Sequence, residues 1–166
     1  MARTEIERSA RQSVLDRLVD LESGVGDAPV TLAQSVRQMK AAVRRDLEWL
    51  LNTRRSIVEV PEDFEELPRS VFAYGLRDVS SLARDSQETR HTLVREVEEA
   101  IARFEPRLAD VRVTLAEQEA GGVNRELHFV VHALLRMDPN PEQVVFDTVL
   151  ELASGDFEVK GGGAGA

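Results

Sequence analysis

The hydrophobic pattern of this chain changes its period at one proline, Pro106. Before Pro106, apolar residues recur at intervals of three and four, the spacing that gathers them on one face of an α-helix. After it, apolar and polar residues alternate, which is typical of a half-buried β-strand. Proline cannot continue a helix, and the residue before a proline is biased towards an extended backbone. The pattern therefore predicts an α+β fold in which the helices come first.

The helical half contains two segments with a clear amphipathic pattern. The first runs from about Thr31 to Asn52, and the second from about Glu88 to Phe104. An acidic loop with two prolines lies between them at residues 59–68, and we expect the following Pro68–Leu76 to form a packed loop or a single helical turn. A further short helix is expected from Asp78 to about Arg84.

The second half predicts strands at Val111–Leu115, Leu127–Leu135 and Val144–Leu152, with Asp156–Val159 as a short fourth. Consecutive strands joined by short loops usually pair antiparallel. We therefore expect N-terminal helices packed on a C-terminal antiparallel β-meander of three to four strands. An edge that a partner strand can use is expected at Val111–Glu117 or at Val144–Leu152.

A length of 166 residues suits one domain with tails. Residues 1–30 are expected to form a flexible N-terminal arm with a short helix, because SGVGDAP separates them from the first clear helix. Residues 31–160 then make a single α+β domain. The final GGGAGA, residues 161–166, is expected to be a disordered tail.

The charge balance narrows the classes of partner. The chain has 30 acidic against 21 basic residues and a net charge of −9, which argues against a nucleic-acid-binding domain, because such a domain needs a basic surface for phosphates. It has no cysteine, which excludes disulfides, thiolate metal sites and a cysteine nucleophile. The start, MARTEIERSARQ, lacks the apolar core of a signal peptide, and the longest apolar runs are far shorter than the ~20 residues of a membrane span. We expect a cytoplasmic protein without direct membrane insertion.

Two histidines raise the question of a metal site. His128 and His132 are four residues apart, which on a helix would place both on one metal ion. Their valine-rich surroundings favour a strand, and on a strand the two imidazoles would lie roughly 13 Å apart. We therefore expect no metal site and no cofactor.

Glu105 is the acid that stands beside an apolar residue and a rigid proline, while most of the acids lie in runs typical of solvated faces. Glycosidase chemistry would need a second carboxyl group within about 5–10 Å. The sequence assigns no such group, so no catalytic residue is predicted, and a binding or structural module is favoured over an enzyme.

The neighbouring Arg107 leaves two interpretations of the E-P-R sequence open. Glu105 and Arg107 form a salt bridge at a helix end, worth about 0–1 kcal/mol if exposed. Alternatively, an extended segment projects both side chains the same way, towards a partner chain. The residues alone do not decide between them.

Three motifs together resemble one family. They are R-R-D-L-E-W-L-L-N-T-R-R (Arg44–Arg55), L-P-R-S-V-F-A-Y-G-L-R-D (Leu67–Asp78) and I-A-R-F-E-P-R-L-A-D-V-R-V (Ile101–Val113). In order and spacing the chain is similar, over residues 13–159, to the TssE family of type VI secretion baseplate subunits, relatives of the phage-tail baseplate wedge proteins long labelled lysozyme-like. S-V-L-D-R-L (Ser13–Leu18) also resembles the start of TssE. The usual Y-G-L-P-D has Arg77 in place of its proline here.

The resemblance implies a structural role. Proteins of this family sit in the baseplate wedge, connect it to the contractile sheath and template the first sheath ring, on a baseplate docked at the inner membrane. Their glutamate–proline–arginine motif matches Glu105, Pro106 and Arg107, which are expected to contact other wedge subunits. Sheath subunits are expected to add strands to an edge of the sheet by β-augmentation. Arg107→Ala is then expected to impair assembly and to leave the isolated fold nearly intact.

Two alternatives remain beside that role. Related wedge proteins initiate the sheath of phage tails and other contractile injection systems, although Ser13–Leu18 and the N-T-R-R sequence favour secretion. The lysozyme-like label would imply peptidoglycan cleavage, which the absence of an assigned second acid near Glu105 disfavours.

Overall fold

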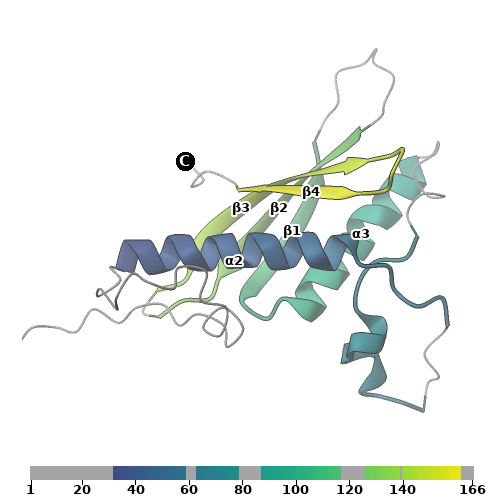
Figure 1. The fold of residues 1–166 in the computed structure, drawn as a ribbon, viewed down its shortest axis with the longest axis horizontal. Coiled ribbons are helices and arrows are strands. Elements are labelled where there is room, and N and C mark those ends of the chain that lie inside the picture. Colours follow the sequence, from purple (N-terminus) through teal and green to yellow (C-terminus); the bar gives the residue numbers. More distant parts are fainter. Residues whose placement is uncertain (1–31, 59–62, 79–86, 117–125, 139, 162–166) are drawn as a thin grey trace, which may run out of the picture.

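A computed structural model describes residues 32–58, 63–78, 87–116, 126–138 and 140–161 (Figure 1). Its elements, in order, are α2 (Leu32–Asn52), the short 3₁₀ helices η1 (Leu67–Arg69) and η2 (Val71–Ala73), α3 (Gln87–Phe104), β1 (Leu108–Leu115), β2 (Glu126–Leu135), β3 (Glu142–Glu151) and β4 (Phe157–Gly161). The predicted α+β fold, with helices followed by an antiparallel meander, is confirmed. No helix of the described residues has the length and apolar character that crossing a membrane requires.

Helices α2 and α3 form where the three-and-four spacing predicted them, and each buries the corresponding face. On α2 the buried side chains include Met39, Val43, Leu47 and Leu50. Those of α3 include Leu93, Val97 and Ile101. Alternate residues of β2 are buried, and the two helices share one hydrophobic core with that face of the sheet. One face of the sheet is therefore covered and the other is exposed to a varying degree.

The sheet has the strand order β1-β2-β3-β4, and every neighbouring pair is antiparallel. The expectation that Val144–Leu152 offers an edge is wrong, because β4 pairs along β3 and leaves it inside the sheet. Strand β1 begins three residues before the predicted Val111. A bulge between Ala109 and Arg112, with Asp110 at φ 51°, interrupts the alternation of buried and exposed residues there. For this reason the hydrophobic pattern did not indicate the first residues of the strand.

Both sheet edges carry side chains from the helices. At the outer edge of β4, Asn52 of α2 donates from Nδ2 to the carbonyl of Phe157 (2.8 Å) and accepts from its N–H (2.7 Å). Arg44 reaches the next outward carbonyl, that of Val159, at 3.5 Å. At the outer edge of β1, Glu98 of α3 accepts the N–H of Val113 (2.9 Å). Side chains thus satisfy backbone groups that would otherwise be open to another strand.

The chain between α2 and α3 leaves the body of the protein and returns to its starting point. The N–H of Arg55 donates to the carbonyl of Leu76 (2.8 Å), and the N–H of Leu76 donates to that of Thr53 (2.9 Å). Gly75 lies between them at φ 101°, and a Cβ there would collide with the carbonyl oxygen of Thr53. Pro68–Leu76, expected as a packed loop or a single helical turn, instead contains the end of η1 and all of η2, which project from the body at the lower right of Figure 1.

Some predicted segments fall outside the part of the chain that the structure describes. They are the short helix of the N-terminal arm, the helix expected from Asp78 to about Arg84 apart from Asp78 itself, and the tail expected at residues 161–166 apart from Gly161, which ends β4.

Candidate functional site

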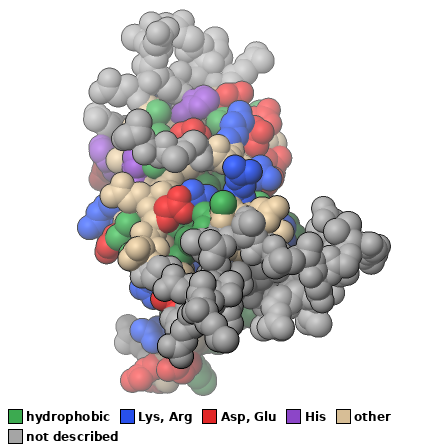
Figure 2. Space-filling view, turned by 90° about the vertical axis from the view of Figure 1, so that its left-hand side faces the viewer, with side chains coloured by type: hydrophobic (Ala, Val, Ile, Leu, Met, Phe, Trp, Pro, Cys, Tyr) green, Lys and Arg blue, Asp and Glu red, His purple; other side chains and the backbone are tan. Residues whose placement is uncertain are grey.

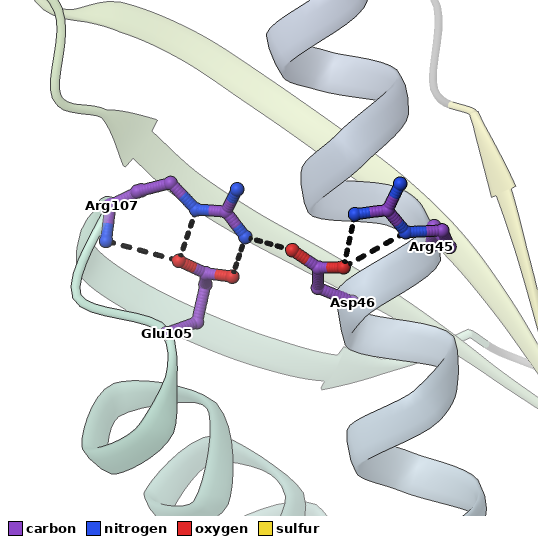
Figure 3. Close-up of polar contacts among 4 residues, drawn as sticks. All are labelled: Arg45, Asp46, Glu105 and Arg107. Atoms are coloured by element: carbon purple, nitrogen blue, oxygen red, sulfur yellow. Dashed lines mark hydrogen bonds and ion pairs between the residues drawn. The ribbon is translucent and has the colours of Figure 1, made fainter. Parts of the chain in front are cut away.

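The three sequence motifs, far apart in the chain, meet where α3 passes into β1. Helix α2 contributes Asp46, and the E-P-R sequence contributes Glu105 and Arg107 (Figure 3). The returning chain after η2 contributes Tyr74. We call these four residues the motif junction. It lies at the contact between the helical layer and the start of the sheet, so its contacts join three segments of the chain.

Pro106 shapes the local backbone. The N–H of Glu105 makes a last helical bond to the carbonyl of Ile101 (2.9 Å), and the N–H of Leu108 closes a turn onto the carbonyl of Glu105 (3.1 Å). Residues 106 and 107 form this turn, because proline cannot extend the helix. The turn directs the Glu105 side chain inward, where only 4% of the residue is exposed.

Glu105 and Arg107 face each other across the turn. Arg107 donates from Nε to Oε1 of Glu105 (2.6 Å) and from Nη2 to Oε2, a two-pronged pairing of guanidinium and carboxylate. The backbone N–H of Arg107 adds a third bond to Oε1 (3.1 Å). The hydrogen bond to Glu105 is the main cause of the raised pKa of Arg107; burial opposes the rise, and Asp46 adds to it. The expected parallel projection from an extended segment is not what the structure contains.

Asp46 extends the pairing to α2. Its Oδ2 lies 2.5 Å from Nη2 of Arg107, and its Oδ1 accepts from Nε (3.0 Å) and Nη2 (2.8 Å) of Arg45. The guanidinium carbon of Arg45 in turn lies 4.9 Å from the ring centroid of Trp49, a cation–π arrangement. A continuous run of contacts therefore leads from buried Glu105 to Trp49, which is 53% exposed.

Tyr74 packs on the same junction. Its ring meets that of Phe104 edge-to-face with 5.3 Å between centroids. Burial is the first cause of the raised pKa of Tyr74, and the charges of Asp46 and Glu105 add to it. Both the burial and the neighbouring charges therefore favour the neutral phenol, whose ring packs on Phe104.

The geometry bears on glycoside hydrolysis, for which Asp46 would be the second acid that the sequence did not assign. A single nitrogen, Nη2 of Arg107, contacts both Asp46 and Glu105. Two hydrolytic carboxyl groups must instead flank a sugar bond. The guanidinium fills that space, so the arrangement ties α2 to the E-P-R turn and has no room for a sugar between its acids.

Sequence reasoning singled out Glu105, Pro106 and Arg107 and missed Asp46 and Tyr74. Asp46 and Tyr74 both lie in the motifs on which the family resemblance rests. The occurrence of these motifs together in one chain was the sequence feature that could have pointed to them. At the surface of the site are Pro106, Trp49 and part of Arg107, whose side chain is 23% exposed.

The two histidines lie away from the motif junction. His128 and His132 occupy exposed positions on β2, as the strand interpretation predicted. In the described ranges, no three or more histidine or acidic side chains are grouped closely enough to hold a metal ion. Figure 2 shows acidic and basic side chains interspersed over one face of the molecule.

Known proteins are similar to this chain at the level of a family model and of a solved structure. The family model described as baseplate wedge protein gp25 matches residues 37–140, more than half of the chain and a range that contains the whole motif junction. No curated protein matches the sequence. Among solved structures, the chain is similar to one described as the baseplate complex from the type VI secretion system, with 20% identity over 68% of this chain and 94% of that chain and a TM-score of 0.47.

Proposed function

The chain belongs to the baseplate wedge protein gp25 family, and from this premise we propose that it connects the baseplate of a contractile type VI secretion apparatus to the sheath and templates sheath polymerisation. Membership of the family makes it a structural baseplate component. The observation that carries the proposal is that the matched range contains the three motifs and that these motifs form one junction. On the same premise its place is the cytoplasmic side of an inner-membrane-docked baseplate.

The choice of a secretion system over a phage tail comes from the sequence. S-V-L-D-R-L at Ser13–Leu18 and N-T-R-R at Asn52–Arg55 resemble TssE. Neighbouring genes test the choice: genes for secretion membrane-complex proteins are expected. Capsid and portal genes would assign the chain to a phage tail and leave its baseplate role unchanged.

For the contact with other wedge subunits we propose the E-P-R turn. Pro106 is exposed, and the exposed part of Arg107 lies beside it. Glu105 and Asp46 fix the guanidinium of Arg107, so that its position is set before a partner arrives. Preorganisation of this kind lowers the entropy cost of binding. In this proposal Arg107 and Pro106 touch the partner, and Glu105 is a positioning residue.

For the sheath contact we propose the outer edge of β1. Asn52 engages both backbone groups of Phe157 on β4, which makes that edge costly to open. On β1, Glu98 engages the N–H of Val113 with one carboxylate oxygen. The carbonyl of an incoming sheath strand can replace that oxygen while Glu98 keeps its contact with exposed Arg112 (3.3 Å). A sheath strand therefore displaces fewer native bonds on β1 than on β4.

Co-purification tests these contacts. The bait is the full chain, with purified wedge and sheath subunits of the same gene cluster, compared with the double variant Glu105→Ala/Arg107→Ala. Both charged partners are removed together, because deleting one alone leaves a buried charge unpaired. The matched control is Arg95→Ala/Glu99→Ala, an exposed ion pair on α3. Circular dichroism accompanies every sample.

We expect the wild type and the control to recover wedge and sheath subunits, and the folded double variant to lose the wedge subunits. Equal recovery by a folded double variant would exclude the E-P-R turn as a contact. If the wild type recovers wedge subunits and never sheath, the connecting and templating role is wrong while the baseplate role stands.

A further inference from the structure

We propose that residues 63–72, here called the apolar knob, insert into an apolar recess with a basic rim on a neighbouring baseplate subunit. Three large apolar side chains of the knob are exposed: Val71 by 88%, Phe64 by 58% and Phe72 by 37%. Exposed apolar side chains gathered in so short a segment typically mark a protein–protein contact. The inference rests on the proposed function only in taking the partner to be a baseplate subunit.

The hydrophobic core of the domain does not include these side chains. Beyond the knob, Ala73 and Leu76 are buried and bring the chain back to the body of the protein. The core instead includes residues of α2, α3 and the strands. Figure 1 shows η1 and η2 standing away from the sheet. The exposed side chains therefore sit on a projection, where a recess in another molecule can reach them.

The knob has internal bonds that fix its shape. Ser70 donates from its hydroxyl to the carbonyl of Leu67 (2.8 Å) and accepts from the N–H of Phe72 (3.2 Å). Backbone bonds close both 3₁₀ turns, from Arg69 to Glu66 (3.0 Å) and from Ala73 to Ser70 (3.1 Å). A segment already shaped in this way loses less conformational entropy on binding than a flexible one.

The acidic charge of the knob indicates that the surface around the partner's recess is basic. Asp63, Glu65 and Glu66 are exposed, and Arg69 is the single basic residue between 63 and 72. Among the described residues, none of the three acids takes part in an ion pair. Complementary charges steer association and select partners. We therefore assign the knob a partner with an apolar recess bordered by lysine or arginine.

Photo-crosslinking in the assembled baseplate tests the proposal. Benzoylphenylalanine replaces Val71 in the full chain, the wedge complex is assembled from purified subunits of the same gene cluster, and the crosslinked peptides are sequenced by mass spectrometry. The control position is Arg95 on α3, whose side chain is 80% exposed. We expect position 71 to crosslink to a different wedge subunit, at apolar residues flanked by lysine or arginine.

A crosslink to residues 1–31 of the same chain, a crosslink to a second copy, or an assembled complex without any crosslink would each overturn the apolar knob as the contact and leave the baseplate role intact. Failure of the wild-type chain to assemble with wedge subunits at all would instead contradict the proposed function, and this inference with it.

Affinity for the crosslinked subunit provides a second readout. Val71→Ala with Phe64→Ala is expected to weaken binding at least tenfold, mainly through faster dissociation. Glu65→Lys with Glu66→Lys is expected to slow association and to reduce its dependence on salt. Unchanged affinity in both folded variants would overturn the proposal. Arg95→Ala serves as the matched control and is expected to bind like the wild type.

Discussion

Asp46 and Arg107 are 61 residues apart in sequence, and an Asp46 carboxylate oxygen lies 2.5 Å from a guanidinium nitrogen of Arg107. This contact ties α2 to the turn that starts the sheet. Since Arg107 also holds Glu105 inside the protein, its side chain is part of the fold as well as of the proposed interface. The expectation of a nearly intact fold in Arg107→Ala has to be revised accordingly.

We now expect Arg107→Ala to lower the free energy of unfolding by about 3 kcal/mol, because it leaves the buried Glu105 carboxylate without its cation. Arg107→Lys keeps the charge but loses the two-pronged geometry, and we expect an intermediate loss. Chemical denaturation followed by the fluorescence of Trp49, the only tryptophan, measures both. Arg95→Ala, at an exposed pair, should change stability by no more than about 0.5 kcal/mol. An equally small change in Arg107→Ala would mean that the pair adds nothing to the fold.

Gly75→Ala is expected to destabilise the protein by more than about 2 kcal/mol. This is the loss typical of substitutions that combine backbone strain with a steric clash. The positive φ disfavours alanine, and the new Cβ would collide with the carbonyl oxygen of Thr53. Gly155→Ala is the matched control, since Gly155 also has a positive φ (78°) but meets the flexible end of the Arg54 side chain. In thermal unfolding, the midpoint temperature of Gly155→Ala should lie between that of Gly75→Ala and that of the wild type. The reverse order would show that the return of the chain at Thr53 is not rigid.

Asn52→Ala should loosen β4, because it removes two hydrogen bonds to Phe157, worth about 1 kcal/mol each. Faster hydrogen exchange of the Phe157 amide is the expected signature. Asn52→Asp keeps the acceptor for that amide but turns a carboxylate oxygen towards the Phe157 carbonyl. We therefore expect the Phe157 amide of this variant to exchange at a rate between those of the wild type and Asn52→Ala. Unchanged exchange in Asn52→Ala would show that water replaces the side chain without cost.

Thr148→Val is expected to stabilise the protein by about 1 kcal/mol. Thr148 is buried in β3, and its hydroxyl has no hydrogen-bond partner within the described residues. Replacing the hydroxyl by a methyl group removes an unsatisfied polar atom at nearly constant shape. Thr114→Val, on the exposed face of β1, is the control and should be close to neutral. A destabilised Thr148→Val, measured by the same denaturation assay, would mean that the hydroxyl finds a partner in solution.

Tyr74 should make the stability dependent on pH at the alkaline end. Its pKa is raised in the folded state by burial and then by Asp46 and Glu105, so the folded protein holds the phenol proton more tightly than the unfolded chain does. Stability from this group is intact below the unfolded pKa of about 10 and is lost as the pH rises towards the folded pKa. Tyr74 is the only tyrosine, so tyrosinate absorbance follows it directly. The free energy of unfolding of Tyr74→Phe should fall less steeply above pH 10 than that of the wild type.

The local pattern of the sequence predicted the elements well and their assembly less well. Helix α2 and strand β2 match their predicted bounds within one residue, because burial of one face imposes a regular spacing. The antiparallel fourth strand expected at Asp156–Val159 is present as β4, whereas the bulge at Asp110 depends on tertiary contacts that leave no period in the sequence. The same limit applies to the site. Asp46 looks like an ordinary charge on an amphipathic helix until the fold brings Arg107 to it.

The backbone bonds at Thr53 and Leu76 close the intervening chain into a loop whose two ends almost meet. Residues replaced, inserted or deleted in the part of this loop that precedes the buried Ala73 leave the separation of the ends unchanged, so the helices and the sheet need not adjust. Evolution can then change the partner that the loop binds without changing the contacts that fold the domain. For engineering, the same closure makes this loop the natural place to exchange one attachment specificity for another.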